Sequence, residues 1–334
     1  MIISQTPYRI SFFGGGTDYP AWYREHGGAV LGTTIDKYCY IMCRYLPPFF
    51  DHNYRIVYSN TELVSALDEV QHPAVRECLR YLGISQGIEL HHHGDLPARS
   101  GMGSSSAFTV GVLNSLYSLL GRMPSKRDLT RDAIRVEQDL IHENVGSQDQ
   151  ALTAIGGFNR IDFFTDDRIV ATPMILPRDR LQELQQHLML VFTGISRNAS
   201  EIASAQIQAT HRNEQQLCTM YQMVDEAINI LASNRPIVEF GKLLDESWKL
   251  KRSLSPLITT DHIDSLYETA SHWGACGGKL LGAGGGGFFL LFVPPERQLR
   301  VKEELGRIVH VPFAFSTAGS QIIYHNNGDK VDSE

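Results

Sequence analysis

The sequence predicts a two-domain protein that combines strands and helices, and three observations carry this prediction. The chain has 334 residues, which is enough for two domains of ordinary size. Segments rich in β-branched and aromatic residues, typical of strands, occur along with segments of helical apolar periodicity. The pattern weakens around residues 173–180, where Pro173 and Pro177 interrupt it. We therefore predict domains over residues 1–175 and 176–325, followed by a disordered tail over 326–334.

Strand-like and helix-like segments follow one another along both predicted domains. In the first domain, strand composition marks residues 8–13, 27–46, 54–59 and 88–90. Helical spacing marks residues 61–83, 107–120 and 125–143, and a helix followed by a strand is expected over 151–164. In the second domain we expect strands over 188–194, 288–293, 311–316 and 320–325, with mainly helical sequence over 199–254 and a helix over 261–273.

Residues 96–108, LPARSGMGSSSAF, join a predicted strand to a predicted buried helix through a turn of glycines and serines. Gly101 and Gly103 allow positive φ angles and a close approach of the backbone to a ligand. The first turn of the helix leaves N–H groups unpaired, the helix dipole places positive charge there, and the serines can cap the helix or offer hydroxyls to a metal ion. The segment therefore predicts a phosphate cradle, although a capped turn without a ligand has the same spacing.

The charge balance and the cysteines limit the classes of function. The 30 basic and 37 acidic residues give a net charge of −7, so the composition predicts no basic surface for nucleic acid or an anionic membrane. The N-terminus lacks a signal-peptide pattern, the longest pure apolar run is Phe288–Val293, and the five cysteines are odd in number with no CxxC pair. We therefore expect a cytoplasmic protein with reduced thiols and no nucleic-acid or membrane partner, and a homodimer stays open.

Three glycine-containing motifs together resemble the signature motifs of the GHMP small-molecule kinases. The motifs are TPYRISFFGGGTDYP, LPARSGMGSSSAF and GGKLLGAGGGGFFLLF, in this order, with GSQDQ between the second and the third. The resemblance extends from Pro7 to Leu291, nearly the whole chain. It implies the α+β class and a two-lobed GHMP kinase fold, with an N-terminal ATP-binding lobe, a ferredoxin-like C-terminal lobe and the active site between them. It also implies that the third motif braces the serine-glycine loop from the other lobe.

Within the family, GGGTDYP, NVGSQDQ followed by GGF, and FTGISRNAS are most similar to the D-glycero-D-manno-heptose 7-phosphate kinases. This similarity implies an ATP-dependent enzyme that phosphorylates the anomeric hydroxyl of this sugar phosphate to the 1,7-bisphosphate, in the biosynthesis of nucleotide-activated heptose. Its small-molecule partners would be a sugar phosphate and ATP. Two alternatives stay open: a kinase of an unphosphorylated sugar such as fucose or galactose, and a catalytically silent sensor that binds sugar and ATP.

The resemblance implies ATP and Mg²⁺ as cofactors and places them on specific residues. The phosphates of ATP would lie on Ser100, Gly101, Met102, Gly103, Ser104, Ser105 and Ser106. The metal ion would be held by Ser105 and Glu137, since a hard cation on a triphosphate needs few protein oxygens. Glu137 stands twelve residues before Asp149, as the magnesium ligand does in galactokinases. Relative to mevalonate kinases this spacing is one residue longer, which puts Gln138 at the corresponding position.

Asp149 and Arg9 are the catalytic residues that the resemblance implies. Asp149 matches the catalytic aspartate of the family, whose carboxylate orients the attacking hydroxyl and takes its proton during phosphoryl transfer. Arg9 matches the basic residue beside that aspartate, where it would keep Asp149 ionised and stabilise charge on the transferring phosphoryl oxygens. Without the resemblance, Asp149 is equally a loop residue or a helix cap, and Arg9 a surface residue of a strand.

The resemblance also implies a set of substrate-binding residues: Gly15, Gly16, Thr17, Asp18, Arg197, Gly284 and Gly285. Asp18 matches the sugar-binding aspartate of the galactokinase motif GEHTDY. In this chain, Gly15 and Gly16 stand where that motif has Glu and His. The replacement removes two polar sugar contacts, which argues against galactose, and frees backbone N–H groups for another sugar or for an anionic group on it.

Arg197, in TGISRNAS, is the candidate for the phosphate that the sugar already carries. A guanidinium matches phosphate oxygens bidentately, which favours arginine at such a site. A charged residue at a helix start gives the same pattern without a ligand. Arg24 and Lys279 are weaker candidates of the same kind.

Overall fold

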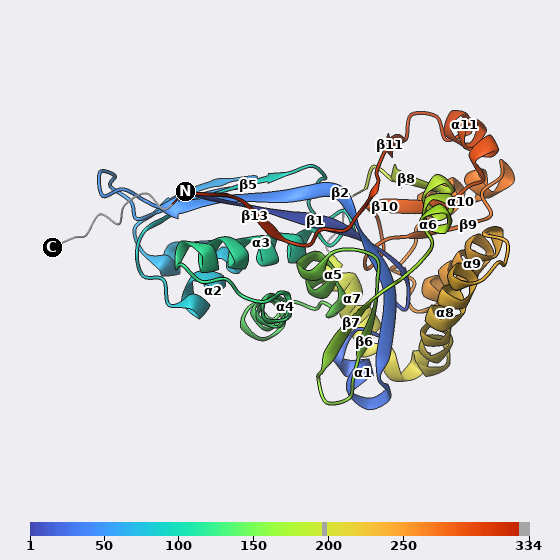
Figure 1. The fold of residues 1–334 in the computed structure, drawn as a ribbon, viewed down its shortest axis with the longest axis horizontal. Helices are drawn as coiled ribbons and strands as arrows, with labels where there is room; N and C mark the ends of the chain where they lie inside the picture. Colours follow the sequence, from blue (N-terminus) through green and yellow to red (C-terminus); the bar gives the residue numbers. More distant parts are fainter. Residues whose placement is uncertain (196–198, 327–334) are drawn as a thin grey trace.

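Two lobes, each built on its own β-sheet, make up the molecule (Figure 1). The computed structural model describes residues 1–195 and 199–326. Within this part of the chain, one sheet has nine strands and the other has four. Each lobe combines a sheet with helices, so the predicted α+β class is confirmed.

The first sheet is organised around two long antiparallel strands, β1 (Ile2–Phe13) and β2 (Gly28–Tyr45). Its other strands are β3 (Tyr54–Val57), β4 (Thr61–Val64), β5 (Ile88–Gly94), β6 (Asn159–Phe163), β7 (Ile169–Pro173), β12 (Phe315–Ser316) and β13 (Gln321–His325). The main order is β13-β1-β2-β5-β3-β4, while β6 and β12 also pair with β2, and β7 pairs with β6. Every residue of β1 from Thr6 to its end is buried, so other parts of the protein pack on both faces of this part of the strand.

Helices cover one face of the first sheet (Figure 1). The longest of them, α3 (Ser104–Leu119), contacts both β1 and β2, and its residues 106–116 are all buried, as the apolar run in the sequence predicts. The others in this lobe are α1 (Pro20–His26), the 3₁₀ turn η1 (Leu67–Glu69), α2 (Pro73–Leu82), α4 (Lys126–Ile134), the π-helix η2 (Arg135–Leu140) and α5 (Gln148–Ile155). The glycine-serine segment therefore ends at the start of a helix fixed by the core of the lobe.

The second sheet is antiparallel, in the order β11-β8-β10-β9. Its strands are β8 (Leu188–Phe192), β9 (Gly277–Leu280), β10 (Phe288–Phe292) and β11 (Val309–Val311). The helices are α6 (Arg178–Gln186), α7 (Ala199–Gln208), the 3₁₀ turn η3 (Thr210–Asn213), α8 (Glu214–Ala232), α9 (Val238–Ser253), α10 (Asp261–His272) and α11 (Pro295–Glu304). Every residue of β9 and β10 is buried, and α9 packs on β9.

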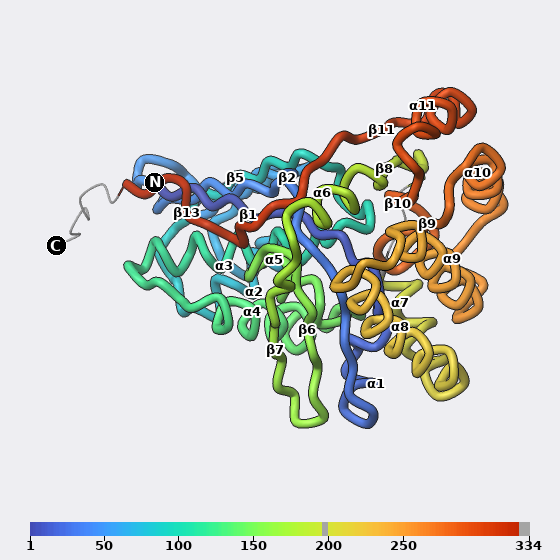
Figure 2. Tube along the Cα trace, turned by 45° about the vertical axis from the view of Figure 1, so that its right-hand side comes forward, coloured from blue at the N-terminus to red at the C-terminus, as the bar shows by residue number. Residues whose placement is uncertain are grey.

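After the second lobe the chain returns to the first (Figure 2). β12 pairs with β2, and β13 pairs with β1 at the edge of the nine-stranded sheet. Asn326, placed in the predicted tail, exchanges backbone hydrogen bonds with Met1. The last two strands thus belong to the first sheet, although the sequence assigns residues 176–325 to one continuous second domain. The boundary after residue 175 stays a prediction, and residues 327–334 lie outside the described chain.

Residues 61–83 form three elements instead of the single predicted helix. Thr61–Val64 is strand β4, which pairs with β3, and Leu63 is 53% exposed there. Helix α2 begins only at Pro73, because proline has no N–H to donate and is well suited to the first helical position. The apolar residues that share a helical spacing in the sequence therefore lie on separate elements.

No helix in the described part of the chain is long and apolar enough to cross a membrane. The five cysteines are free thiols, and three of them are buried. These thiols are the outcome that their odd number and the missing CxxC pattern predict.

Candidate active site

A cleft between the lobes brings the glycine motifs together. Its wall in the first lobe is formed by the end of β1, the glycine turn that follows it, the serine loop and residues 143–149. Its wall in the second lobe is formed by α7, the end of α9, β9 and the turn after β9. Segments far apart in the sequence thus meet at one site.

The serine loop presents the start of α3 to this cleft. Gly101 and Gly103 have φ angles of 79° and 71°, which side-chain-bearing residues rarely adopt, and Gly103 is the N-cap of the helix without a side-chain cap. Gly101, Gly103, Ser104, Ser105 and Ser106 all line the cleft. The first N–H groups of α3 have no carbonyl partner within the helix, and the positive end of its dipole lies there. This arrangement suits a bound phosphate.

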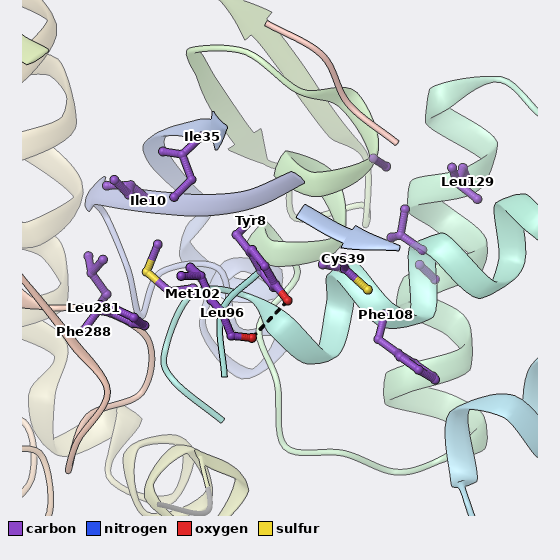
Figure 3. Packing of buried hydrophobic residues seen from close by; sticks show 14 of the residues in the cluster. Tyr8, Ile10, Ile35, Cys39, Leu96, Met102, Phe108, Leu129, Leu281 and Phe288 are labelled. Carbon is purple, nitrogen blue, oxygen red and sulfur yellow. Dashed lines mark hydrogen bonds between the residues drawn. The ribbon is translucent and has the colours of Figure 1, made fainter. Parts of the chain in front are cut away.

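Two of the seven residues predicted to hold phosphate lie away from the cleft. Met102 is fully buried and belongs to the same hydrophobic cluster as Leu281 and Phe288 (Figure 3). Ser100 is fully buried as well, and its carbonyl accepts a hydrogen bond of 2.9 Å from the N–H of Phe288. These two residues fix the loop to the second lobe and leave the glycines and serines to face the cleft.

The turn after β9 packs directly on the serine loop. A Cβ on Gly101 would lie 2.4 Å from the Leu281 carbonyl oxygen, and one on Gly282 would lie 2.5 Å from the Cα of Gly101. Only glycine allows this approach of the two backbones. Gly282 and Ala283 line the cleft, while the predicted Gly284 and Gly285 do not.

Gly284 and Gly285 pack against a loop of the second lobe instead. The N–H of Gly285 donates to the Ile258 carbonyl over 2.8 Å, and a Cβ on Gly284 would lie 2.8 Å from the Cα of Ile258. The glycine run therefore turns away from the cleft after Ala283, and the geometry does not support the predicted substrate contact of Gly284 and Gly285.

Arg9 connects Asp149 to the serine loop. Its Nε and Nη2 atoms donate to the two carboxylate oxygens of Asp149, each over 2.6 Å, and Nη1 donates to the Gly101 carbonyl over 2.7 Å. The backbone N–H of Arg9 donates to the Met102 carbonyl over 3.1 Å. Arg9 is 3% exposed, whereas the side chain of Asp149 is 26% exposed. The carboxylate therefore faces the cleft with a fixed orientation beside the loop.

Asp18 lies on the same wall and is almost fully buried. Its carboxylate accepts hydrogen bonds from the N–H groups of Gly16, over 3.0 Å, and of Gln148, over 3.3 Å. Burial, followed by the nearby Asp149 carboxylate, raises the pKa of Asp18. Gly15 and Gly16 line the cleft next to it, as predicted for the substrate side.

Thr17 does not reach the cleft, although the sequence places it among the substrate-binding residues. Its side chain is fully buried, its hydroxyl donates to the Gly14 carbonyl over 2.8 Å, and it accepts from the N–H of Ala29 over 3.2 Å. The hydroxyl thus acts as both donor and acceptor within the protein, and Thr17 stabilises the glycine turn after β1.

Glu137 lies behind the serine loop. Oε2 accepts a hydrogen bond of 2.8 Å from the Ser106 hydroxyl and another from the Gln150 amide, while Oε1 has no partner among the described residues. Burial raises the pKa of Glu137 to about 7, against the opposing effect of the neighbouring Thr109, Ser106 and Gln150 side chains. The hydroxyl bonded to Glu137 belongs to Ser106, whereas the predicted metal ligand Ser105 is exposed and lines the cleft.

The pairing of Glu137 with Ser106 fits a magnesium ion that is mainly coordinated by a triphosphate. Glu137 itself does not line the cleft, but its unpartnered carboxylate oxygen and the Ser106 hydroxyl, which does, are hard oxygen ligands, and few protein oxygens are needed. Across the described residues, no cluster of three or more His, Cys, Asp or Glu side chains could hold a metal by itself. A metal site here would therefore depend on the nucleotide.

Glu137 and Gln138 both lie in the π-helix η2. A π-helix places one more residue in each turn than an α-helix, and such turns are frequent at functional sites. Gln138, the competing candidate, points elsewhere: its amide donates to the Val145 carbonyl and the Ser147 hydroxyl, each over 3.1 Å. The geometry therefore favours Glu137 over Gln138.

Two lysines of the second lobe also line the cleft. Lys251, at the end of α9, was not singled out by any motif, and Lys279, in β9, was only a weak candidate. A sequence signal existed only for Lys279, which lies in the third glycine motif. Of the other candidates for a sugar phosphate, Arg24 lies off the cleft in an exposed ion pair with Asp167, and Arg197 lies outside the described residues.

The chain is similar to known proteins in sequence and in fold. The GHMP kinases N-terminal domain matches residues 68–157 and the GHMP kinases C-terminal domain matches residues 224–310, together more than half of the chain. A D-glycero-alpha-D-manno-heptose 7-phosphate kinase from Campylobacter jejuni is 28% identical over 91% of this chain and 93% of its own. A bifunctional fucokinase/GDP-fucose pyrophosphorylase from Arabidopsis thaliana is 26% identical over 86% of this chain and 29% of its own. The crystal structure of a D-glycero-D-manno-heptose 1-phosphate kinase from Bacteroides thetaiotaomicron shares the fold, with a TM-score of 0.80 and 21% identity over 98% of this chain and 100% of its own.

Proposed function

The chain belongs to the GHMP kinase family, and we propose that within this family it transfers the γ-phosphoryl group of ATP to the anomeric hydroxyl of D-glycero-D-manno-heptose 7-phosphate. The product would be the 1,7-bisphosphate, a precursor of nucleotide-activated heptose. As a GHMP kinase, the protein is a phosphotransferase with an alcohol group as acceptor, and ATP is its phosphate donor.

One observation carries the kinase chemistry of the proposal. The Asp149 carboxylate, oriented by Arg9, lies within van der Waals range of the serine loop: a Cβ on Gly103 would be 3.4 Å from Asp149 Oδ2. A phosphate on the first turn of α3 and a hydroxyl at Asp149 would thus lie next to each other. Phosphoryl transfer depends mainly on this kind of positioning and on electrostatic stabilisation.

Each part of the proposed reaction would use its own set of residues. The first turn of α3 would hold the phosphates of ATP, and the carboxylate of Asp149 would orient the sugar hydroxyl and accept its proton. Gly15, Gly16 and Asp18 would bind the sugar on the far side of Asp149. Glu137 and Ser106 would hold Mg²⁺, which neutralises charge on the phosphates when it is bound.

Two observations support the choice of a seven-carbon sugar phosphate. It depends on the relative at 28% identity and on the Gly15-Gly16 pair, which leaves out the polar sugar contacts of galactokinases. Arg197 stays the candidate for the phosphate at the 7-position. A kinase of an unphosphorylated sugar is the second candidate, favoured by the 26% identity to a fucokinase-containing protein.

An ADP-release screen separates these candidates. Six-carbon and seven-carbon sugars are each tested with and without a terminal phosphate, and phosphorus NMR assigns the product anomer. We expect turnover with heptose 7-phosphate and little with the unphosphorylated sugars. A higher kcat/KM for free fucose or galactose than for any sugar phosphate would refute the heptose proposal, and calorimetric binding without product would indicate a silent sensor.

The role of Arg197 has its own test. Arg197→Ala should raise the KM for the phosphorylated sugar more than the KM for the same sugar without phosphate, because a guanidinium–phosphate contact is lost only in the first case. Equal changes in both KM values would remove Arg197 from the phosphate site.

A further inference from the structure

Two buried lysines of the second lobe face the cleft, and neither forms an ion pair with a carboxylate in the described part of the chain. Lys251 is 7% exposed and Lys279 is 3% exposed. We propose that these two ammonium groups form a phosphate-binding pair that holds the phosphoryl group during its transfer from ATP to the sugar. This inference rests on the proposed kinase function and extends it to residues outside the motif-based set.

Each lysine keeps N–H donors that the protein does not use. Lys279 Nζ donates to the Phe12 carbonyl over 2.8 Å, and Lys251 Nζ donates to the Leu280 and Gly282 carbonyls over 2.8 and 2.6 Å. An ammonium group has three donors, so two remain on Lys279 and one on Lys251 within the described chain. Both side chains line the cleft, where an anionic oxygen can accept these hydrogen bonds.

The charges around the pair are unbalanced. Neither lysine forms an ion pair with a carboxylate of the described residues. Of the two carboxylates near them, Asp149 is bound on both oxygens by Arg9, and Asp18 accepts from the backbone N–H groups of Gly16 and Gln148, so three cationic side chains share two carboxylates. A buried ammonium without a counter-ion is costly, and such charges are normally paired. An anionic ligand in the cleft would supply the missing charge.

The positions of the two ammonium groups match the two ends of a phosphoryl transfer. Lys251 is bonded to Gly282, which packs on Gly101 of the serine loop, where the phosphates of ATP would lie. Lys279 is bonded to Phe12, two residues before the glycine turn on the sugar side. The pair therefore spans the step from donor to acceptor.

Arg9 is poorly placed to do this alone. Its Nε, Nη1 and Nη2 atoms all donate to Asp149 or to the Gly101 carbonyl, and its side chain is 3% exposed. The main task of Arg9 in this geometry is to orient the carboxylate and the loop. These bonds use three of its five N–H donors, so one remains on Nη1 and one on Nη2, and the two lysines would add three more donors at the cleft.

The ionisation of the lysines is consistent with an anion site. Burial lowers the pKa of Lys279 to about 7, with a further lowering by Arg9 and an opposing effect of Asp18. Burial also holds the pKa of Lys251 well below its usual range, with Lys279 and Arg9 lowering it and Asp18 and Asp149 raising it. A bound phosphate would raise both pKa values, so its affinity should fall as the pH rises above about 7.

The test measures binding of inorganic phosphate by Lys279→Met, Lys251→Met and the wild-type chain. Phosphate replaces chloride at constant ionic strength, and the phosphate concentration for half of the maximal rise in Tm is recorded. Because hydrogen bonds to a charged group are strong, we expect each variant to bind phosphate about tenfold more weakly or worse. Lys249→Met, on the same helix with a side chain 67% exposed, should bind phosphate like the wild type.

The outcomes separate a ligand site from a structural role. Methionine has a similar length and no charge, so both variants should fold with a Tm at least equal to that of the wild type. Unchanged phosphate affinity in both variants would overturn the proposal. If a methionine variant does not fold, Lys279→Arg and Lys251→Arg keep the charge, and loss of phosphate binding in these folded variants would also contradict it.

The same experiment is independent of the identity of the sugar. Weakened phosphate binding in the variants, together with no turnover of any sugar phosphate by the wild type, would support the phosphate-binding pair and refute the proposed substrate. Turnover of heptose 7-phosphate with unchanged phosphate binding in the variants would retain the substrate and refute the pair.

Discussion

Arg9 and Asp149 face each other through two hydrogen bonds of 2.6 Å, between the guanidinium edge and both carboxylate oxygens. A third bond, from Arg9 Nη1 to the Gly101 carbonyl, extends this pair to the serine loop. The Asp149 carboxylate and the serine loop are therefore held by one side chain, that of Arg9. Arg9 lies in the middle of β1, where the strand is buried on both faces. A site that must position a hydroxyl against a phosphate benefits from such rigidity.

Asp149→Asn should lower kcat by about two to four orders of magnitude and leave the affinity for ATP nearly unchanged. The amide keeps the size of the side chain but cannot accept the proton of the sugar hydroxyl, while the first turn of α3 is untouched. Steady-state ADP release measures kcat, and calorimetry measures nucleotide binding. An Asn variant with full turnover would remove Asp149 from the role of base.

Arg9→Met should reduce both turnover and stability. It leaves the Asp149 carboxylate without its ion pair and the Gly101 carbonyl without a donor, so we expect a loss of about 3 kcal/mol in the free energy of unfolding, measured by urea denaturation. The matched control is Arg24→Met, since the Arg24–Asp167 pair is exposed and should contribute less than about 1 kcal/mol. Equal losses in the free energy of unfolding would show that the buried Arg9–Asp149 pair stabilises the fold no more than the exposed Arg24–Asp167 pair does.

Local signals in the sequence were sufficient for the serine loop and its helix. Two glycines with positive φ, a serine run and a long apolar segment each specify the backbone without reference to the rest of the chain. Asp149 and Arg9 came from the family motifs, and the fold brings them together. Helix periodicity failed over residues 61–83, because a proline and a strand pairing override it there.

Other features depend on packing that no local pattern records. Successive residues of a helix point about 100° apart, so which serine meets Glu137 depends on the rotation of α3, and the structure selects Ser106 over Ser105. The π-helix that carries Glu137 is likewise not apparent in the sequence, because the apolar spacing over residues 125–143 is that of an ordinary helix. Lys251 becomes part of the site only because α9 packs on β9, far from the motifs in sequence.

Glu137→Gln should raise the Mg²⁺ concentration for half-maximal activity about tenfold to hundredfold, because a hard cation prefers a carboxylate oxygen to an amide. The hydrogen bond from Ser106 can persist to the amide oxygen, so the fold should be retained. Activity is titrated with Mg²⁺ at saturating ATP. Asp139→Asn is the control, as Asp139 is exposed on the same π-helix. The same Mg²⁺ dependence in both variants would place the metal ligand elsewhere.

Lys279→Met should make the protein more stable at neutral pH, by an amount that shrinks as the pH rises. Burial lowers the pKa of Lys279 to about 7 from an ordinary value of 10.5, so between these values the folded chain binds fewer protons than the unfolded chain. The wild type therefore gains stability from this residue as the pH rises through that window, and carries the full cost of the buried charge below pH 7. We expect the variant to be about 1–3 kcal/mol more stable at pH 7, after the loss of the bond to Phe12, and this advantage to decline towards pH 10.

Urea denaturation at pH 6, 7, 8 and 9 tests this dependence on pH. Lys249→Met, whose side chain is exposed, should show a difference from the wild type that stays constant across the series. A Lys279→Met variant that is less stable by the same amount at every pH would mean that the lysine serves only as a hydrogen-bond donor to β1. In that case the ammonium group would not carry a desolvation cost, and the cleft would not need an anion to balance it.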